Sequence, residues 1–483
     1  MRASDFDLVI IGAGSGGLTA AGFAARLGAR VALVEKDRIG GDCTWHGCVP
    51  SKALLRAAKA AHEVRTAARF GIVVGPPGVD LSVVDLSVVD LSVVDLSKVR
   101  ASLREAITRV YHFESPEELR SQGVEIIEGE ARFLDARTIQ VGHTVLRAKT
   151  FLLATGARPR IPAIAGLAEI PFHTYQSIFD NDRLPASMIV VGGGPIGMEI
   201  AQAYRRFGVQ VTIVAAQLLP KDEPEVSETM ARVFEREGIH WIRGCVRAVR
   251  KESGAVVAVS DSGEARGEML FIGSGRAPVV DALDPGKAGV KFSERGIPVD
   301  SRFRTNVKHI YAAGDVTGGP QFTHLAGWQA FQAARNALLP GSSDGLSPLP
   351  SATFTDPEVA HVGLSEQTAR ARFGDRIQVG RQDMSRTDRA ICDAAEDGFV
   401  KIVAAPNGRI LGATIVHSRA GEAICELALA IKMKMKTSDL AGVIHPYPGY
   451  SSATWQLAGD MTLERLLSGV SGSIVRGLSK LVR

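Results

Sequence analysis

Residues 6–17 read FDLVIIGAGSGG, an apolar run that passes directly into a glycine cluster. Such a run is typical of a buried strand, and glycines at Gly12, Gly14 and Gly17 allow the tight turn and close backbone approach that a dinucleotide needs at a helix start. Glu35 ends the next apolar run, where a carboxylate can accept hydrogen bonds from ribose hydroxyls. The sequence therefore predicts a βαβ unit over residues 7–35 that binds a dinucleotide.

Residues 188–215 repeat the pattern of apolar run, glycine cluster and second apolar run. The fingerprint glycines of this second unit are Gly192, Gly194 and Gly197. Ala215 stands where the first unit has Glu35, and Lys221 is the only cation close behind it in the sequence. Because a neutral residue neither holds a ribose 2′-hydroxyl nor repels a 2′-phosphate, the choice between NADH and NADPH stays open.

The bulk composition is that of a globular protein with several domains. The chain has 483 residues, 45% of them hydrophobic and 22% charged, with 51 glycines where an alternating strand and helix pattern needs turns. A net charge of +4 over this length does not favour nucleic acid as a partner, and no apolar run approaches the roughly 20 residues of a spanning helix. We expect an α/β protein in the cytoplasm that acts on small molecules.

Residues 40–52 read GGDCTWHGCVPSK and carry the most specific chemistry. Cys43 and Cys48 are close enough in sequence to close a small disulfide ring at a helix start, where backbone N–H groups lower a thiol pKa. The alternatives are an inert buried pair and half of a metal site, but no second cysteine pair or histidine cluster completes such a site, so no metal is predicted. Cys245, Cys392 and Cys425 are scattered, and we expect them to be buried apolar residues.

A five-residue repeat interrupts the first unit. Residues 80–99 read DLSVV three times and then DLSKV, a period that matches neither helix nor strand. A solvated loop without function is favoured over a binding role. A helix is expected to restart with Asp95 as its N-cap and Glu105 inside it.

The cysteine segment resembles the pyridine nucleotide-disulfide oxidoreductases, the family of glutathione reductase, dihydrolipoamide dehydrogenase and mercuric reductase. The likeness runs from about residue 6 to about residue 460, and residues 385–400 and 445–448 look closest to the mercuric-reductase-like branch. Further motifs occur in the family's order: Ala154-Thr-Gly156, the second fingerprint with Glu199, Gly275-Arg276, Tyr311-Ala-Ala-Gly314-Asp315, and residues 355–363.

The resemblance implies FAD, NAD(P)H and a homodimer whose active sites each draw on both subunits. Cys43 would exchange with substrate, Cys48 would lie beside the flavin, Lys52 would pair with Glu199, and Asp315 would hold the ribityl chain. The implied cofactor-binding set is Gly12, Gly14, Gly17, Glu35, Gly41, Lys52, Thr155, Gly156, Gly192, Gly194, Gly197, Glu199, Gly275, Arg276 and Asp315.

The implied fold has two Rossmann-like dinucleotide-binding domains and a C-terminal α+β dimerisation domain. We expect an FAD-binding domain at 1–156, which holds the repeat, an NAD(P)-binding domain at 157–276, a segment at 277–345 that completes the FAD site, a dimerisation domain at 346–462, and an amphipathic basic tail at 463–483. The tail carries leucines and other apolar residues at helical steps. Packing on the dimer is favoured over weak contact with a membrane surface.

The chain departs from the family at the acid/base histidine and the glutamate five positions after it. Counting from His445 puts Tyr450 at the glutamate position, and counting from Tyr447, which is favoured, puts Ser452 there. Neither register supplies a carboxylate, so we expect weak activity on ordinary disulfides. The chain also lacks the C-terminal cysteine pair of mercuric reductases.

The predicted function is an NAD(P)H-dependent flavin oxidoreductase. Electrons would pass through FAD and the Cys43–Cys48 disulfide to a disulfide or thiophilic metal ion, as in mercuric reductase, with His445, Tyr447, Lys52 and Glu199 completing the catalytic set. Dihydrolipoamide dehydrogenase or quinone or oxygen reductase activity is the enzymatic alternative. A flavin-binding redox sensor is the alternative from another class.

Overall fold

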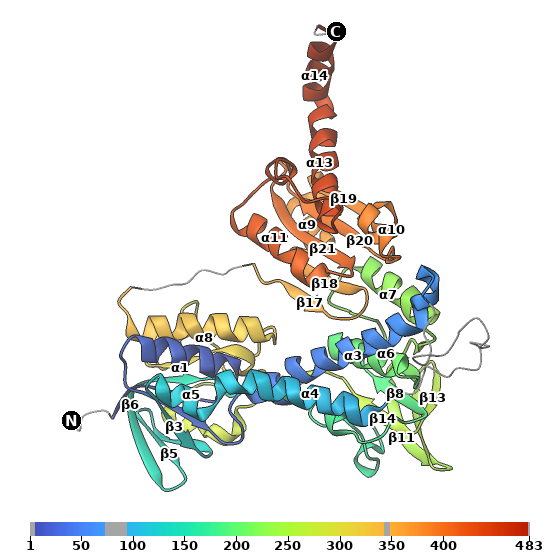
Figure 1. The fold of residues 1–483 in the computed structure, drawn as a ribbon. Coiled ribbons are helices and arrows are strands. Elements are labelled where there is room, and N and C mark those ends of the chain that lie inside the picture. Colours follow the sequence, from blue (N-terminus) through green and yellow to red (C-terminus); the bar gives the residue numbers. More distant parts are fainter. Residues whose placement is uncertain (1–4, 73–93, 342–347, 482–483) are drawn as a thin grey trace.

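The computed structural model describes residues 5–72, 94–341 and 348–481. They form an α/β protein in which the two predicted nucleotide-binding units and the C-terminal region each have a sheet of their own (Figure 1). The predicted fold class is confirmed: two Rossmann-like units precede an α+β domain.

The quoted apolar run is the central strand of the first sheet. The strand order is β3-β2-β1-β6 with β16 on the far side of β6, all parallel, and the hairpin of β4 and β5 adds antiparallel pairing to the first half of β6. Leu8, Val9 and Ile10 are completely buried. The strands are β1 (Phe6–Ile11), β2 (Val31–Glu35), β3 (Val124–Glu128), β4 (Ala131–Asp135), β5 (Thr138–Val141), β6 (Thr144–Leu153) and β16 (Ile310–Ala312).

The helices of this unit place the two cysteines at its edge. Helix α1 begins within the fingerprint, directly after Gly14, and packs beside α8, although the two helices are far apart in the sequence (Figure 1). A Cβ at Gly12, where φ is +102°, would lie 2.3 Å from the carbonyl oxygen of Ala154, so this turn requires glycine. The helices are α1 (Ser15–Arg26), α2 (Gly41–Trp45), α3 (Cys48–Thr66), α4 (Leu96–Tyr111), α5 (Pro116–Ser121) and α8 (Thr323–Leu338).

The expected helix start at Asp95 is confirmed. Helix α4 begins at Leu96, and the Asp95 carboxylate accepts hydrogen bonds from the backbone N–H groups of Ser97 and Lys98. Glu105 lies within this helix. The repeat itself falls largely on residues 80–93, which lie outside the described residues, so its predicted character as a loop stays a prediction.

The second unit has a four-stranded parallel sheet in the order β10-β9-β8-β14. Helix α6 begins within the second fingerprint, directly after Gly194, and a three-stranded antiparallel sheet, β11-β12-β13, is attached to the unit. The short pair of β7 (Ala157–Pro159) and β15 (Arg276–Pro278) connects the two units. The elements are β8 (Ser187–Val191), α6 (Pro195–Arg206), β9 (Gln210–Val214), α7 (Pro224–Arg236), β10 (His240–Ile242), β11 (Val246–Glu252), β12 (Ala255–Ser260), β13 (Gly263–Gly267) and β14 (Met269–Ile272).

The C-terminal domain is a five-stranded antiparallel sheet, in the order β17-β18-β21-β20-β19, with helices packed on it. Its strands are β17 (Ser351–Thr353), β18 (Glu358–Gly363), β19 (Gln378–Asp383), β20 (Phe399–Ala404) and β21 (Ile410–His417). Its helices are α9 (Glu366–Phe373), α10 (Asp388–Cys392), α11 (Ala420–Lys432), α12 (Thr437–Ala441), α13 (Ser451–Leu467) and α14 (Gly469–Leu481).

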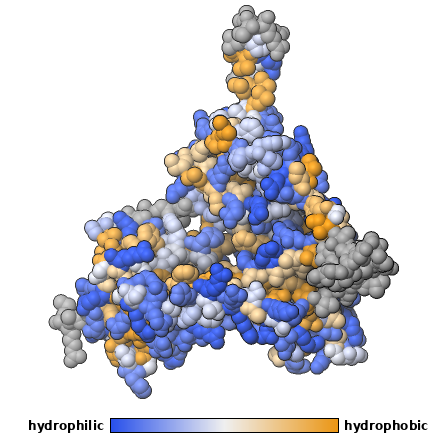
Figure 2. Space-filling model, viewed as in Figure 1, coloured by the Kyte–Doolittle hydropathy of each residue, from blue (hydrophilic) through white to orange (hydrophobic). Residues whose placement is uncertain are grey.

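The tail is helical, as expected, and extends away from the rest of the molecule. Helix α14 follows α13 after a break at Ser468 and projects beyond the C-terminal domain (Figure 1). Leu463, Leu466 and Ile474 are all exposed, and Figure 2 shows apolar surface along this projection. Within the described ranges, no helix combines the length and apolar content needed to cross a membrane.

The expectation that the three scattered cysteines are buried is wrong. Cys245, Cys392 and Cys425 are all exposed. Cys245 follows the edge strand β10, Cys392 ends the short helix α10, and Cys425 lies between the buried Ile424 and the half-buried Glu426 on the outer side of α11. An isolated cysteine in a sequence carries no periodic signal of its own, and here each falls on a solvent-facing position.

Candidate active site

Two helix starts bring the cysteines together. Cys43 lies in α2 and Cys48 is the first residue of α3, with Gly47 between the helices. A Cβ at Gly47 would come within 2.9 Å of the carbonyl oxygen of Asp42, so the close turn favours glycine. Both thiols are free and half-buried, and they hydrogen-bond to each other.

The two thiols differ in acidity. The hydrogen bond from Cys43 lowers the pKa of Cys48 to about 6 against the opposing effect of burial, and Thr323 and the positive charge of Lys52 lower it further. The same hydrogen bond, together with burial, raises the pKa of Cys43. Cys48 therefore carries the negative charge of the pair at neutral pH, and Cys43 keeps its proton.

Thr323 is a contact that the sequence motifs did not indicate. Its Oγ1 lies 3.2 Å from the Sγ of Cys48. It begins helix α8, which is remote from the cysteines in the chain but packs against α1 beside them. No spacing or composition signal links the two residues, so only the fold reveals the contact.

Lys52 and Glu199 meet as the resemblance implied. Lys52 Nζ lies 2.9 Å from Glu199 Oε2, and the other carboxylate oxygen accepts a hydrogen bond of 2.9 Å from the backbone N–H of Phe354. The ammonium group also lies 4.5 Å from the centre of the Phe354 ring. One lysine thus connects the cysteine helix, the second unit and the C-terminal domain.

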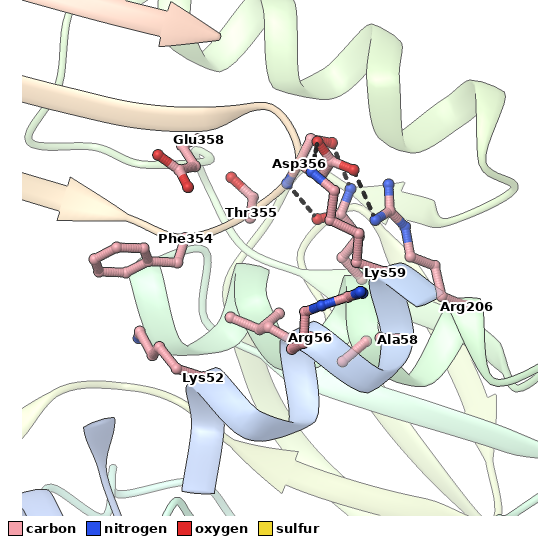
Figure 3. Close-up of a pocket in the computed structure, with 12 residues that line it drawn as sticks. Lys52, Arg56, Ala58, Lys59, Arg206, Phe354, Thr355, Asp356 and Glu358 are labelled. Atoms are coloured by element: carbon pink, nitrogen blue, oxygen red, sulfur yellow. Dashed lines mark hydrogen bonds and ion pairs between the residues drawn. The ribbon is translucent and has the colours of Figure 1, made fainter. Parts of the chain in front are cut away.

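A pocket with both charged and apolar side chains in its walls opens beside this contact (Figure 3). Its volume is about 160 Å³, and its walls come from α3, from α6 and from residues 354–358 of the C-terminal domain. Asp356 forms ion pairs with Lys59 at 3.5 Å and with Arg206 at 3.0 Å. Because opposite charges within the pocket already neutralise one another, the pocket holds the domains together more than it offers a free charge to a ligand.

The first fingerprint has the geometry that a dinucleotide requires. Glu35 Oε2 accepts a hydrogen bond of 2.7 Å from the N–H of Ala13, which fixes the carboxylate at the carboxyl end of β2. A Cβ at Gly17 would lie 1.8 Å from the carbonyl oxygen of Gly12, and one at Gly41 would lie 2.7 Å from the Cα of Gly14. These close approaches leave the backbone open to a pyrophosphate at the N-terminus of α1.

A charged cluster surrounds Asp315, the residue expected to hold the ribityl chain. Arg276 bridges Asp42 at 2.6 Å and Asp315 at 3.2 Å, and its Nε is buried with no partner among the described residues. Burial raises the pKa of Asp315, and the charge of Arg276 opposes that rise. A buried donor without a partner next to a carboxylate suits a bound group with hydroxyl oxygens, so these residues fit the cofactor.

Tyr175 and Asp42 were not predicted. The Tyr175 hydroxyl donates a hydrogen bond of 2.8 Å to Asp42, the residue directly before Cys43, and burial raises its pKa. The remaining predicted residues of this region, Thr155 and Gly156, lie at the β6–β7 turn, where Thr155 Oγ1 donates to the carbonyl of Val279 at 2.6 Å. Gly156 and Gly275 both have positive φ angles.

The second fingerprint repeats the first except at its acidic position. A Cβ at Gly197 would lie 2.2 Å from the carbonyl oxygen of Gly192, similar to the close approach at Gly17 in the first unit, whereas a Cβ at the N-cap Gly194 would meet nothing within 4 Å. Ala215 follows β9 without a polar side chain.

The two register positions supply no carboxylate, as expected, but the inference that His445 and Tyr447 lack an acidic partner is wrong. His445 Nε2 lies 2.8 Å from Glu426 Oε1, and the Tyr447 hydroxyl donates a hydrogen bond of 2.5 Å to Asp388. The acids come from helices α11 and α10 and not from the loop, because the antiparallel sheet folds these distant helices around it. The residues at the two register positions, Tyr450 and Ser452, are buried, and neither is the acidic partner.

Comparison with known proteins places the chain in a family. Residues 6–330 match the model of the pyridine nucleotide-disulphide oxidoreductases, and residues 349–458 match that family's dimerisation domain. The chain therefore belongs to the pyridine nucleotide-disulphide oxidoreductases.

Curated relatives carry two activities. A mercuric reductase of Bacillus cereus is 33% identical, over 92% of this chain and 69% of that protein. A dihydrolipoyl dehydrogenase of Haloferax volcanii is also 33% identical, over 94% of this chain and 96% of that protein.

Solved structures of similar fold agree with the family membership. An HOCl-induced flavoprotein disulfide reductase from Escherichia coli superposes with a TM-score of 0.82 at 25% identity, covering 94% of this chain and 99% of that one. LpdA from Mycobacterium tuberculosis gives a TM-score of 0.84 at 26% identity, covering 94% and 99%.

The family membership defines the class of chemistry. The protein is a flavoprotein oxidoreductase that depends on FAD and uses NAD(P)H, and its dimerisation domain supports a homodimer. Bound FAD supplies the two-electron link between reduced nicotinamide and the cysteine pair.

Proposed function

We infer that the protein passes electrons from NAD(P)H, through FAD and Cys43–Cys48, to a disulfide or thiophilic metal ion, in a manner similar to mercuric reductase. The observation that carries this is the arrangement of the two thiols at neighbouring helix starts, with the Thr323 hydroxyl 3.2 Å from the sulfur of Cys48. Cys48 is the anion, held by Thr323 and Lys52, whereas Cys43 retains the proton. A pair built this way has one sulfur for the flavin and one for the acceptor.

With a disulfide acceptor, the reaction has two thiol-disulfide exchange steps. The sulfur of Cys43 loses its proton and attacks, so that a mixed disulfide forms and one product leaves as a thiol. Cys48 then attacks Cys43, which releases the second thiol and restores the Cys43–Cys48 bond. With a soft metal ion, the same two sulfurs are ligands of the type such ions prefer.

The C-terminal loop supplies the proton chemistry in this proposal. The hydrogen bond to Glu426 orients the ring of His445, and in this role His445 delivers a proton to the departing thiol of a disulfide substrate. The hydrogen bond to Asp388 raises the pKa of Tyr447, so this phenol stays neutral and acts as a hydrogen-bond donor. The pairing of His445 with Glu426 favours a dihydrolipoyl-dehydrogenase-type reaction as the second candidate.

A panel of acceptors under steady state tests the proposal. Hg(II), lipoamide, glutathione disulfide and a quinone are each supplied with NADH and with NADPH. We expect turnover with a thiophilic ion or a disulfide, and a loss of at least about 100-fold in Cys43→Ser, because the sulfur that meets the acceptor is gone. Undiminished turnover in Cys43→Ser would point to electrons leaving the flavin directly, and no turnover with any acceptor would point to a sensor.

The exposed thiols require a control for the metal assay. Cys245, Cys392 and Cys425 can bind soft ions without turnover. A variant with all three changed to Ser keeps only the redox pair, and its turnover with Hg(II) should equal or exceed that of the unchanged protein. A loss in this variant alone would assign the metal chemistry to another thiol. The predicted domain boundaries, the cytoplasmic location and the weak membrane contact of the tail stay predictions.

A further inference from the structure

The carboxyl ends of β9 and β10 form the part of the second nucleotide site that differs most from the first. In the first unit, Glu35 of β2 pairs in register with Glu128 of β3. In the second unit, the register pairs Val214 with Ile242, so that Ala215 and Arg243 are the next neighbours along the two strands. The structure thus has a neutral residue and a cation where the first unit has two carboxylates.

Hydrogen bonds fix this arrangement. The carbonyl oxygen of Ala215 accepts from the indole Nε1 of Trp241 at 2.9 Å and from the N–H of Gly244 at 3.2 Å. Arg243 lies between these two donors in the chain. Its backbone is therefore held beside Ala215 on both sides.

The side chain of Arg243 lies on the same face of the sheet as that of Ala215. Residues paired across parallel strands share a face, and so do residues two apart on one strand, which places Ile213, Ala215, Trp241 and Arg243 together. The guanidinium carbon lies 4.4 Å from the centre of the Trp241 ring, a stacked position that reduces its freedom. The side chain of Ala215 faces the fingerprint loop, since a Cβ added at Gly193 would lie 3.0 Å from the Cβ of Ala215.

The charge of Arg243 is uncompensated. It is exposed, and no carboxylate among the described residues lies within ion-pair distance of it. The nearest acid along the neighbouring hairpin, Asp261, is already occupied by the N–H of Cys245 at 2.8 Å and by Arg247 at 3.4 Å. Glu223, in the loop after β9, is buried against Lys401.

We propose that Arg243 binds the 2′-phosphate of NADPH and makes the protein selective for NADPH over NADH. This rests on the proposed function, in which a reduced nicotinamide is the electron donor. An arginine at the ribose edge pairs with a phosphate through two parallel hydrogen bonds, and the stacked Trp241 holds it ready. NADH would leave the guanidinium without a partner and its own 2′-hydroxyl without a carboxylate to accept it.

Binding of adenosine fragments to the FAD-loaded dimer tests this without any acceptor or turnover. We expect 2′,5′-ADP, measured by calorimetry, to bind at least about tenfold more tightly than 5′-AMP. Arg243→Ala should remove this difference and leave 5′-AMP binding unchanged, while Arg243→Lys should restore part of it. Flavin content and the melting temperature show whether each variant is folded.

The matched control is Lys221→Ala, which removes the other exposed cation of this region and should keep the difference. Equal binding of the two fragments to the unchanged protein would overturn the proposal, as would loss of the difference in Lys221→Ala but not in Arg243→Ala. Ala215→Glu should raise the KM for NADPH and lower that for NADH. Because fragment binding involves no acceptor, a failed acceptor panel would reject the proposed function and leave this result intact.

Discussion

The thiol of Cys48 owes its low pKa to neighbours from three parts of the chain. Cys43 comes from the adjacent short helix, Lys52 from the next turn of α3, and Thr323 from a helix far along the sequence. The sequence predicted only the closeness of Cys43 and Cys48, because a cysteine pair at a helix start is a local pattern; Lys52 was expected to pair with Glu199. The hydroxyl of Thr323 could not be predicted, since its position depends on how α8 packs on α1.

We therefore expect the thiolate absorbance of the reduced protein to titrate with a midpoint near pH 6. The folded pKa of Cys48 is depressed, so the anion and the stability that it contributes are present above the unfolded pKa and are lost as the pH falls through about 6. Thr323→Val should move the midpoint upward, because it removes a hydrogen bond to the sulfur while conserving shape. A far-ultraviolet absorbance titration under anaerobic conditions measures the midpoint in the unchanged protein and in Thr323→Val.

Ser51→Ala is the control for this titration. Its hydroxyl donates to the carbonyl of Cys48 at 3.3 Å and not to the sulfur, so the midpoint should stay where it is. An unchanged midpoint in Thr323→Val would mean that the hydroxyl does not stabilise the anion. The same titration in Cys48→Ser should show no transition near pH 6.

Among the elements, β20 carries a buried charge that fastens two domains. Lys401 is only 3% exposed and lies 2.7 Å from both Glu225 and Glu366 and 3.4 Å from Glu223. Burial opposes the charge of Lys401, but the hydrogen bonds that it donates to Glu225 and Glu366 outweigh this effect and raise its pKa. No pattern in the sequence predicts that a lysine inside an apolar strand pairs with acids across a domain boundary.

We predict that Lys401→Met lowers the free energy of unfolding by about 3–5 kcal/mol, because three carboxylates lose the cation between them. The difference in free energy of unfolding between the two proteins should shrink at acidic pH. The ion pairs with Lys401 lower the pKa of Glu225 and Glu366. The stability that these ion pairs contribute is therefore present above the unfolded carboxyl pKa and is lost as the pH falls. Denaturant unfolding of both proteins at neutral and at acidic pH measures this difference.

Lys251→Met is the matched control for this change, since Lys251 is exposed on β11 and has no ion pair among the described residues. Its effect should stay within about 0.5 kcal/mol. Adding Glu366→Gln to Lys401→Met should recover part of the loss. If the double change were worse than the single one, unpaired negative charge would not be the cause.

At the scale of the whole molecule, the order of strands and helices followed from the sequence, but the surfaces did not. The two βαβ units were predicted because glycine turns and apolar runs are local signals, and β16 joins the first sheet where the motif order implied. The carboxylate partners of His445 and Tyr447 and the exposure of the cysteines depend on which faces of the C-terminal helices are covered. Sequence patterns do not carry that information for single residues.

The C-terminal domain exposes apolar side chains close to the His445 loop. Ile444 is 95% exposed, Leu429 of α11 is 58% exposed, and Met433, the C-cap of α11, is 65% exposed. The His445–Glu426 contact ties the loop to the same helix, so the three form one surface, and Figure 2 shows apolar surface gathered on this domain. A dimerisation domain with such a surface is expected to bury it against a second copy.

We predict that Leu429→Asp weakens or abolishes the dimer, because a carboxylate at this surface would be desolvated without a partner. Turnover with a disulfide should then fall by about 100-fold, since the His445 loop would no longer act on the cysteine pair of the other subunit. Reduction of the flavin by NAD(P)H should persist, because both fingerprints and Lys52 lie within one chain. Sedimentation velocity, acceptor turnover and anaerobic stopped-flow reduction separate these effects.

The control is Glu422→Ala, an exposed change near the start of α11, which should leave the dimer, the turnover and the flavin reduction unaltered. A monomeric Leu429→Asp protein with full disulfide turnover would show that each subunit contains a complete active site.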